Sequence, residues 1–518
     1  MAYSGATPRP AMSSAFQPGS AWAWDSPQAA AADAGLYDQV REALAQANYS
    51  DAGIARALGL DTLSRLGERR LAALLRRTGG GSPLETLIRL FVLDQPVART
   101  SAQRAVGAGA LEAFSALGLL RGEGEAVRAV LQLRCWQGLV LAWDFARRGP
   151  GGLREDYVMG VSPSSLLLAA MTPRRRVEAV FDLGSGCGIQ ALLAAAHGTR
   201  VVGADCNPRA VAVANFNARL NRCVQVEFRL GDMFAPVAGE PFDLIVSNPP
   251  FIITPDTRHL FLTSGAEADE VCRTIIAAAP RHLREGGWCI LTANWAVAAG
   301  EDWAARLRSW CEGSGCDALV LHESLRQTDE YAAGLIEVAE DDAAAFDRAF
   351  ASWMDYYDRR GFVAIGQGVI ALRRASGRSH WFGVETAPLN LAMAAGDDLE
   401  RIFAQRTWLH GLDGPADLLA SRLRLAPGVR LEQDCECEGG GWRPRTARLH
   451  RTAGLHFAGS IDATGAALLA GFDGTRSVRD QIERLAGMVS AEAAALTPAA
   501  LATVRRLTEQ GFLTAACE

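Results

Sequence analysis

The residues with the clearest chemical potential form the short run Asn248-Pro249-Pro250-Phe251. The Asn248 side-chain oxygen and the Pro249 carbonyl are two acceptors that can take both N–H protons of a planar amino group, which orients the nitrogen lone pair towards an electrophile. Two consecutive prolines stiffen the loop, and Phe251 can stack on a planar molecule. The alternative is that the run is only a rigid turn after a strand.

A second run, VFDLGSGCGIQ at Val180–Gln190, places glycines at alternate positions after an apolar strand. Glycines there let the backbone turn tightly and approach a ligand where a Cβ would clash. By itself the loop fits a dinucleotide, a flavin or a structural turn. The residues expected at the ligand are Asp182, Gly184, Ser185, Gly186 and Gly188.

Two more acidic residues follow the next two predicted strands. Asp205 ends the apolar run that starts at Arg200, where a carboxylate can accept hydrogen bonds from both hydroxyls of a ribose. Asp232 comes after the third strand, where it can accept from the exocyclic amine of adenine while Met233 lies against the ring. Each acid stands at a strand end, so together they predict a nucleoside site.

In this order the motifs resemble the class I S-adenosylmethionine (SAM) dependent methyltransferases, in the "small methyltransferase domain" branch with an Asn-Pro-Pro-[Phe/Tyr] motif. DLGSGCG is similar to the family's acidic–glycine loop, Asp205 to its ribose-binding acid and Asp232 to its adenine-binding residue. A dehydrogenase would need GxGxxG, whereas this loop reads GxGxG. The resemblance covers about 157–374, with 157–165 similar to the family's lid over the cofactor.

The resemblance implies SAM as the cofactor and a methyl acceptor as the partner. Asn248, which would also touch the cofactor, Pro249 and Phe251 would then be the catalytic residues. In that family the motif serves exocyclic amines of adenine or guanine and the side-chain amide of glutamine.

The stretch after Phe251 departs from the family's pattern, because it reads HLFLTSG at 259–265 where Tyr, Arg and Asp are typical. We therefore expect a changed acceptor. His259 could assist proton loss, although a surface histidine is the plainer interpretation. The acidic residues beyond it either grip a cationic acceptor or only begin a helix at the favourable end of its dipole, and Trp295 either lines the pocket or packs in the core. The candidate substrate residues are His259, Glu267, Asp269, Glu270 and Trp295.

These residues must be positioned by a sheet, since short apolar strands alternate with helices beyond residue 151. The expected fold class is α/β, with a Rossmann-like seven-stranded methyltransferase sheet. Strands are expected at 179–183, 200–204, 224–229, 242–247, 288–292, 318–322 and 369–373, with a helical insertion between the last two.

Composition changes along the chain predict four segments. Residues 1–32 are rich in Ala, Ser, Pro and Gly and are expected to be a disordered tail. Residues 33–150 are expected to form a helical, winged-helix-like module and 151–375 the methyltransferase domain. Residues 376–518 are expected to form an α+β domain whose end is winged-helix-like.

The 52 basic and 58 acidic residues give a net charge of −6, which offers no support for non-specific binding of nucleic acid. No signal peptide pattern and no run of about 18 apolar residues is seen, and 11 scattered cysteines suit a reduced cytosolic protein. We expect a cytoplasmic protein without a membrane partner. We expect no metal, because neither Cys435–Cys437 nor Cys311–Cys316 has the spacing of a zinc site. The oligomeric state stays open.

Four functions fit these observations. Acidity and the altered loop favour N-methylation of a planar amino, amide or guanidino nitrogen of a small molecule. The Asn-Pro-Pro-Phe motif and the winged-helix-like modules favour an RNA or DNA base methyltransferase. The helical N-terminal module beside that motif favours a protein glutamine N-methyltransferase. The fourth is a non-catalytic SAM-binding protein, against which the intact loop and Asn248 argue.

Overall fold

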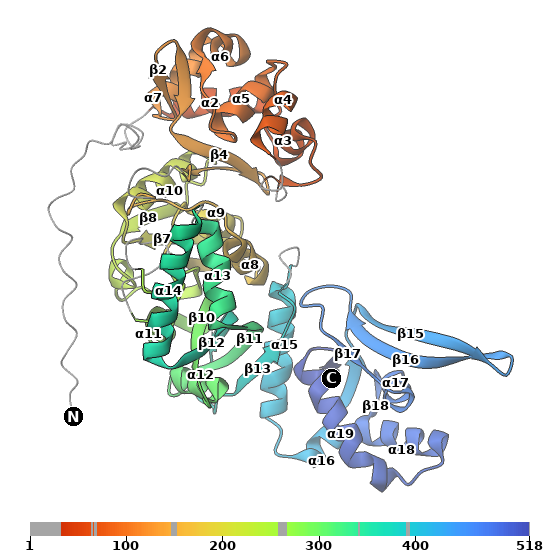
Figure 1. Ribbon diagram of the computed structural model, residues 1–518. Coiled ribbons are helices and arrows are strands. Elements are labelled where there is room, and N and C mark those ends of the chain that lie inside the picture. Colours follow the sequence, from red (N-terminus) through yellow and green to blue (C-terminus); the bar gives the residue numbers. More distant parts are fainter. Residues whose placement is uncertain are drawn as a thin grey trace, which may run out of the picture. The chain divides into compact units, whose positions relative to one another are not determined.

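The computed structural model describes residues 33–63, 66, 70–146, 153–256, 267–339, 342–389 and 394–516 (Figure 1). It divides into two compact units. One comprises Met1–Gly152 with Asn215–Arg222, and the other Leu153–Ala214 with Cys223–Glu518. Each unit is described by itself below. Within the described residues, no helix is long and apolar enough to cross a bilayer.

The first unit contains a three-stranded antiparallel sheet in the order β1-β3-β2 and a separate hairpin of β4 and β5. From α5 to β3 the element order is helix, strand, helix, helix, strand, strand, which is winged-helix-like. Its core includes the ring pair of Phe91 and Phe114, whose centroids lie 5.3 Å apart. The elements are α2 (Ala34–Gln46), α3 (Asp51–Leu58), α4 (Leu71–Arg77), α5 (Pro83–Phe91), β1 (Val97–Ala98), α6 (Arg99–Val106), α7 (Ala108–Ala116), β2 (Leu120–Glu123), β3 (Ala126–Ala129), β4 (Leu131–Trp136) and β5 (Leu139–Asp144).

The last turns of α10 (Pro208–Leu220) also belong to this unit. There the Asn217 side chain accepts from the N–H of Ala142 at 2.7 Å and donates to its carbonyl at 2.9 Å. Asn221, four residues further, does the same at Val140 with distances of 2.8 and 2.7 Å. Because residues four apart share a helix face, the two side-chain amides satisfy the free backbone edge of β5 as a neighbouring strand would.

The second unit is built on an eight-stranded sheet in the order β13-β11-β12-β10-β9-β6-β7-β8. Only β12 runs antiparallel to its neighbours, which confirms the Rossmann-like α/β fold class. The strands are β6 (Val177–Leu183), β7 (Gly198–Asp205), β8 (Val226–Leu230), β9 (Phe242–Ser247), β10 (Leu283–Ala298), β11 (Cys316–Gln327), β12 (Phe362–Arg374) and β13 (Phe382–Thr386).

The sheet differs from the expectation in two ways. It has one strand more than the seven expected, because β13 pairs in parallel with β11 from Phe382 to Thr386. In addition, β10, β11 and the start of β12 extend well past the expected ranges. At β10, the strand continues for seven residues beyond Leu291, the partner of the last residue of β9. β10 therefore extends beyond the point where its neighbour β9 ends.

The helices of the methyltransferase region include the expected insertion, which consists of α13 and α14 between β11 and β12. The expected cap of α10 is also present, because the Asn207 oxygen accepts from the N–H of Arg209 at 2.9 Å. The helices are α8 (Pro163–Met171), α9 (Ile189–Ala194), α10 (Pro208–Leu220), α11 (Glu270–Ala278), α12 (Trp303–Cys311), α13 (Thr328–Ala339) and α14 (Ala343–Arg360), with short 3-10 turns η2 (Ala235–Val237) and η3 (Ala279–His282).

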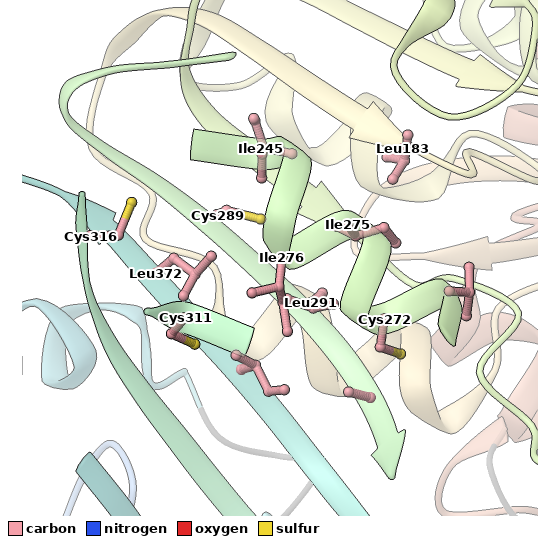
Figure 2. Close-up of a cluster of buried hydrophobic side chains, with 14 of the residues drawn as sticks. Leu183, Ile245, Cys272, Ile275, Ile276, Cys289, Leu291, Cys311, Cys316 and Leu372 are labelled. Carbon is pink, nitrogen blue, oxygen red and sulfur yellow. The ribbon is translucent and has the colours of Figure 1, made fainter. Parts of the chain in front are cut away.

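Side chains of β10 alternate between the two faces of the sheet, and each face contributes to a different hydrophobic core. The odd-numbered residues from Cys289 to Val297 join the main core, which α11 and α12 cover and part of which Figure 2 shows. On the other face, Ala296 joins a smaller core with Ile253 and residues of α13, α14 and β12. The helical insertion is therefore packed on the extended part of the sheet.

The C-terminal region carries two further three-stranded sheets, β18-β14-β19 and β15-β16-β17. Buried Glu385 on β13 ties it to the large sheet, since this carboxylate pairs with Arg506 at 2.6 and 2.8 Å and with Arg406. The elements are α15 (Gly396–His410), α16 (Pro415–Ala420), β14 (Arg422–Leu425), β15 (Val429–Glu438), β16 (Gly441–Arg451), β17 (Ala458–Ser460), α17 (Ala463–Leu469), β18 (Asp473–Ser477), α18 (Val478–Val489), α19 (Ala493–Glu509) and β19 (Leu513–Ala515).

Candidate active site

The glycine-rich loop connects β6 to α9 at the carboxyl end of the sheet. Gly184, Gly186 and Gly188 have φ values of 73°, 54° and 86°, in the left-handed region that favours glycine. A Cβ on Gly184 or Gly186 would meet nothing within 4 Å, whereas one on Gly188 would lie 2.8 Å from the ring of Phe228. The first two glycines therefore face open space, and the third permits close packing.

Asp182, at the end of β6, contacts the start of α9 just after this loop. Its side chain is almost completely buried and accepts from the backbone N–H of Ala191 at 3.1 Å. Burial, which penalises the charged form, raises the pKa of Asp182 to about 7. Ser185 is buried too, and its hydroxyl donates to the Asp182 carbonyl at 3.0 Å. The Ser185 side chain therefore closes the turn and faces the protein.

Asp205 lies at the end of β7 and joins the loop to the neighbouring strand. One carboxylate oxygen accepts from the N–H of Gly186 at 2.9 Å, and the other from the N–H of Asn207 at 2.8 Å. Burial raises the pKa of Asp205, and the backbone N–H groups of Asn207, Gly186 and Cys206 lower it. A carboxylate offers about four lone-pair sites, so beyond these N–H groups Asp205 retains acceptor capacity for a hydroxyl group.

Beyond β8 the chain turns at Asp232 and Met233. Asp232 is exposed. Met233 has a φ of 51° and packs partly against the main core. Both residues follow a strand parallel to β7, so they stand at the same edge as the glycine loop and Asp205.

These groups fit the adenosine part of SAM. The open side of Gly184 and Gly186 gives a backbone surface without side chains, Asp205 supplies a hydroxyl acceptor and Asp232 an exposed carboxylate. The chain passes from β6 to β7 and β8 on one side of the sheet and then to β9 on the other side of β6. Open α/β sheets bind ligands at such a switch point.

Asn248 follows the last residue of β9 and its amide is held from both sides. The Asn248 oxygen accepts from the Thr292 hydroxyl at 2.6 Å, and its nitrogen lies 3.3 Å from the Ser165 hydroxyl. Ser165 is fixed in turn, because Gln190 donates to its carbonyl at 2.7 Å. The second lone pair of the Asn248 oxygen is available to an acceptor N–H. Pro249 is buried beside it.

Phe251 is partly buried and packs against the main core. Ser165 and Thr292 were not identified from the sequence as site residues. A signal was present for Thr292, because it is a polar residue in the apolar run of β10. Ser165 lies at the end of the segment expected to be the lid, without a feature that singles it out.

Three of the candidate substrate residues, all acidic, bond to other residues of the chain. Asp269 accepts from the N–H of Ala296 at 2.9 Å and pairs with Arg306 at 3.0 Å. Glu267 pairs with Arg360 at 2.6 Å, and Glu270 pairs with Arg273 at 2.6 Å on the exposed start of α11. Each of these carboxylates is thus paired with an arginine of the chain itself. His259 lies outside the described residues.

Of the two interpretations of Trp295, packing in the core holds and lining of the acceptor pocket does not. Trp295 is 0% exposed and stacks on Trp303 with ring centroids 5.4 Å apart. Its position on β10 turns it into the main core, where it covers Gly366 of β12, on which a Cβ would clash with its ring.

Family models match three regions of the chain. The family model "methyltransferase small domain" matches residues 160–302, and two domains of unknown function match 46–130 and 400–515. The release factor glutamine methyltransferase of Xylella fastidiosa strain Temecula1 is 31% identical over 234 residues, covering 40% of this chain and 81% of its own.

Two further matches cover a smaller share of the relative or have a low structural similarity. The ribosomal RNA small subunit methyltransferase C of Alcanivorax borkumensis is 34% identical over 133 residues, covering 25% of this chain and 37% of its own. The solved structure of the YcgJ protein of Bacillus subtilis aligns with a TM-score of 0.28 and 15% identity, over 42% of this chain and 99% of its own.

Proposed function

Because the chain belongs to the class I SAM-dependent methyltransferases of the small methyltransferase domain branch, we propose that it methylates the side-chain amide nitrogen of a glutamine in a protein. It is an enzyme, and SAM is its cofactor. The observation that carries the proposal is the Asn248 amide, held by Thr292 and Ser165 at the end of β9. A group fixed in this way is suited to orient a planar amide.

SAM, when bound, supplies a methyl group on a positively charged sulfur. The Asn248 oxygen and the Pro249 carbonyl accept the two N–H protons of the acceptor amide and present its nitrogen to that methyl carbon. Methyl transfer would form the nitrogen–carbon bond as the carbon–sulfur bond breaks, and one of the two N–H protons would leave to solvent. Thr292 and Ser165 keep the Asn248 oxygen from rotating away during the transfer, so little reorganisation is needed.

Neither relative described above is named for a small-molecule acceptor. The Xylella relative, which this chain matches over most of its length, is a protein methyltransferase by name. The paired carboxylates at Glu267, Asp269 and Glu270 also weaken the case for an acidic pocket that grips a small cation. Both observations favour the glutamine amide over a guanidino group.

The test is methylation of three acceptors by the purified full-length protein with deuterated SAM, read by mass spectrometry. The acceptors are a bacterial release factor, small-subunit ribosomal RNA and a low-molecular-weight cell extract. We expect a single labelled methyl group on a glutamine of the release factor, and its loss with Asn248→Ala. Labelling confined to the small-molecule fraction would contradict the proposal.

A ribosomal RNA base is the second candidate, and the Alcanivorax relative favours it. That relative is matched over only 37% of its length, and the net charge of −6 offers no general attraction for RNA. Labelling of the RNA and not of the release factor would establish this candidate instead.

A further inference from the structure

The segment that follows Asn248-Pro-Pro-Phe is fixed at one peptide residue, Ile253, by two tyrosines from the helical insertion. The N–H of Ile253 donates to the Tyr331 hydroxyl oxygen at 3.3 Å, and the Tyr357 hydroxyl donates to the Ile253 carbonyl at 2.7 Å. Tyr331 lies on α13 and Tyr357 on α14. The three residues are at most 1% exposed.

The Tyr331 hydroxyl is itself held from the sheet, because the Asn294 side chain donates to it at 2.8 Å. Asn294 stands two residues after Thr292 on β10, so both side chains point to the same face of the strand. Thr292 binds the Asn248 amide, and Asn294 reaches Ile253 through Tyr331. Two successive polar residues on one face of β10 thus hold the two ends of a single loop.

A small core surrounds this arrangement. Ile253, Ala296, Tyr331, Ala332, Ile336, Tyr357 and Ile365 pack together there. In this apolar surrounding, the loss of one hydroxyl leaves a buried backbone group unpaired, which is costly. The loop is therefore pinned at Ile253 by hydrogen bonds and not only by packing.

We propose that Tyr331 and Tyr357 are positioning residues for methyl transfer, which set the orientation of residues 248–251 by fixing the backbone at Ile253. This inference rests on the proposed function, in which Asn248 orients the acceptor amide. In this proposal the helical insertion positions the methyl acceptor and does not take part in SAM binding. Asp182 and Asp205 instead accept from the backbone N–H groups of Ala191, Gly186 and Asn207.

The test compares Tyr331→Phe and Tyr357→Phe with wild type and with Tyr49→Phe. Tyr49 is a matched control, since its buried hydroxyl donates to the Leu133 carbonyl at 2.8 Å in the other unit. We measure kcat on the release factor, the dissociation constant of SAM and amide hydrogen exchange of residues 248–256. Each phenylalanine variant of the insertion should lower kcat roughly ten- to hundred-fold, leave the SAM affinity within about two-fold, and speed exchange at 248–256. Tyr49→Phe should change none of the three.

The double variant should lose less than the product of the two single losses, because both hydroxyls act on one peptide residue. A kcat within about two-fold of wild type in both single variants overturns the proposal. So does a loss of SAM affinity that equals the loss of kcat. If the wild-type protein leaves the release factor unmethylated, the proposed acceptor fails, and the exchange data decide the inference. Faster exchange at Asn248 and Phe251, which carry the only backbone N–H groups of residues 248–251, supports it, and unchanged exchange at both overturns it.

Discussion

Replacing Asp182 with Asn should change how the stability of the protein depends on pH. The Asp182 side chain is almost completely buried under the glycine loop, and burial raises its pKa from the ordinary 3.8 to about 7. In the unfolded chain this carboxyl group is ionised above pH 4, while in the folded protein it keeps its proton until about pH 7. The folded state therefore binds a proton that the unfolded chain has released, and the free energy of unfolding falls as the pH rises through this window.

The size of the effect follows from the width of the window. Between pH 5 and the folded-state pKa of about 7, each pH unit lowers the free energy of unfolding by about 1.4 kcal/mol. The contribution of Asp182 between pH 5 and pH 8 is then about 3 kcal/mol. Above pH 8 both states are ionised at this position and the contribution is constant. Asparagine cannot ionise, and its amide oxygen can still accept from the N–H of Ala191.

The assay is urea unfolding of the cofactor-free protein at pH 5 and pH 8, followed by circular dichroism, for wild type and Asp182→Asn. Other groups titrate in both proteins, so the informative quantity is the difference between variant and wild type. We expect the variant to gain about 3 kcal/mol relative to wild type between pH 5 and pH 8. A difference that stays constant within about 1 kcal/mol, set against the 3 kcal/mol expected, would refute the reasoning about the buried acid.

Three further predictions concern the site and the flanking module. Asp205→Ala should weaken SAM binding most and Asp232→Ala less, since a lost partner costs roughly ten- to hundred-fold in affinity. Calorimetry that finds unchanged affinity in both variants contradicts the cofactor assignment. Asn248→Ala should leave SAM affinity nearly intact and lower kcat at least about a hundred-fold. Thr292→Val, which keeps the Asn248 amide but removes its hydroxyl partner, should lower kcat less. Equal losses of SAM binding and turnover in Asn248→Ala would mean that Asn248 is structural. A chain that begins near Gly151 should bind SAM in calorimetry but fail to methylate the acceptor, and full activity of that chain would exclude a role of the N-terminal module in acceptor selection.

The sequence predicts the positions of the glycine loop and of the acids at the strand ends well, for a physical reason. Short apolar strands in a parallel sheet leave few choices of register, and each ends where a glycine or an acid follows. Asp182 and Asp205 are therefore found at strand ends as expected. The glycines at 184, 186 and 188 adopt the conformation for which glycine is needed.

The acceptor half was less predictable. Trp295 could face either side of β10, and only the pairing of that strand with β12 decides that it enters the core. Thr292 and Ser165 meet Asn248 from distant parts of the chain, and no local pattern brings them together. Strand β13 was missed because Phe382–Thr386 is short and its partner β11 lies far away in sequence.

The contacts at Ile253 also determine when the active site can be completed during synthesis. Tyr331 lies 78 residues beyond Ile253 and Tyr357 lies 104 residues beyond it. At about 5–20 residues per second, the ribosome needs roughly 5–20 s to add the longer stretch. The strands that carry Asp182 and Asp205 are made before this interval begins. The residues proposed to bind SAM are thus synthesised well before the partners that fix the acceptor loop, and the contacts at Ile253 require closure over about a hundred residues.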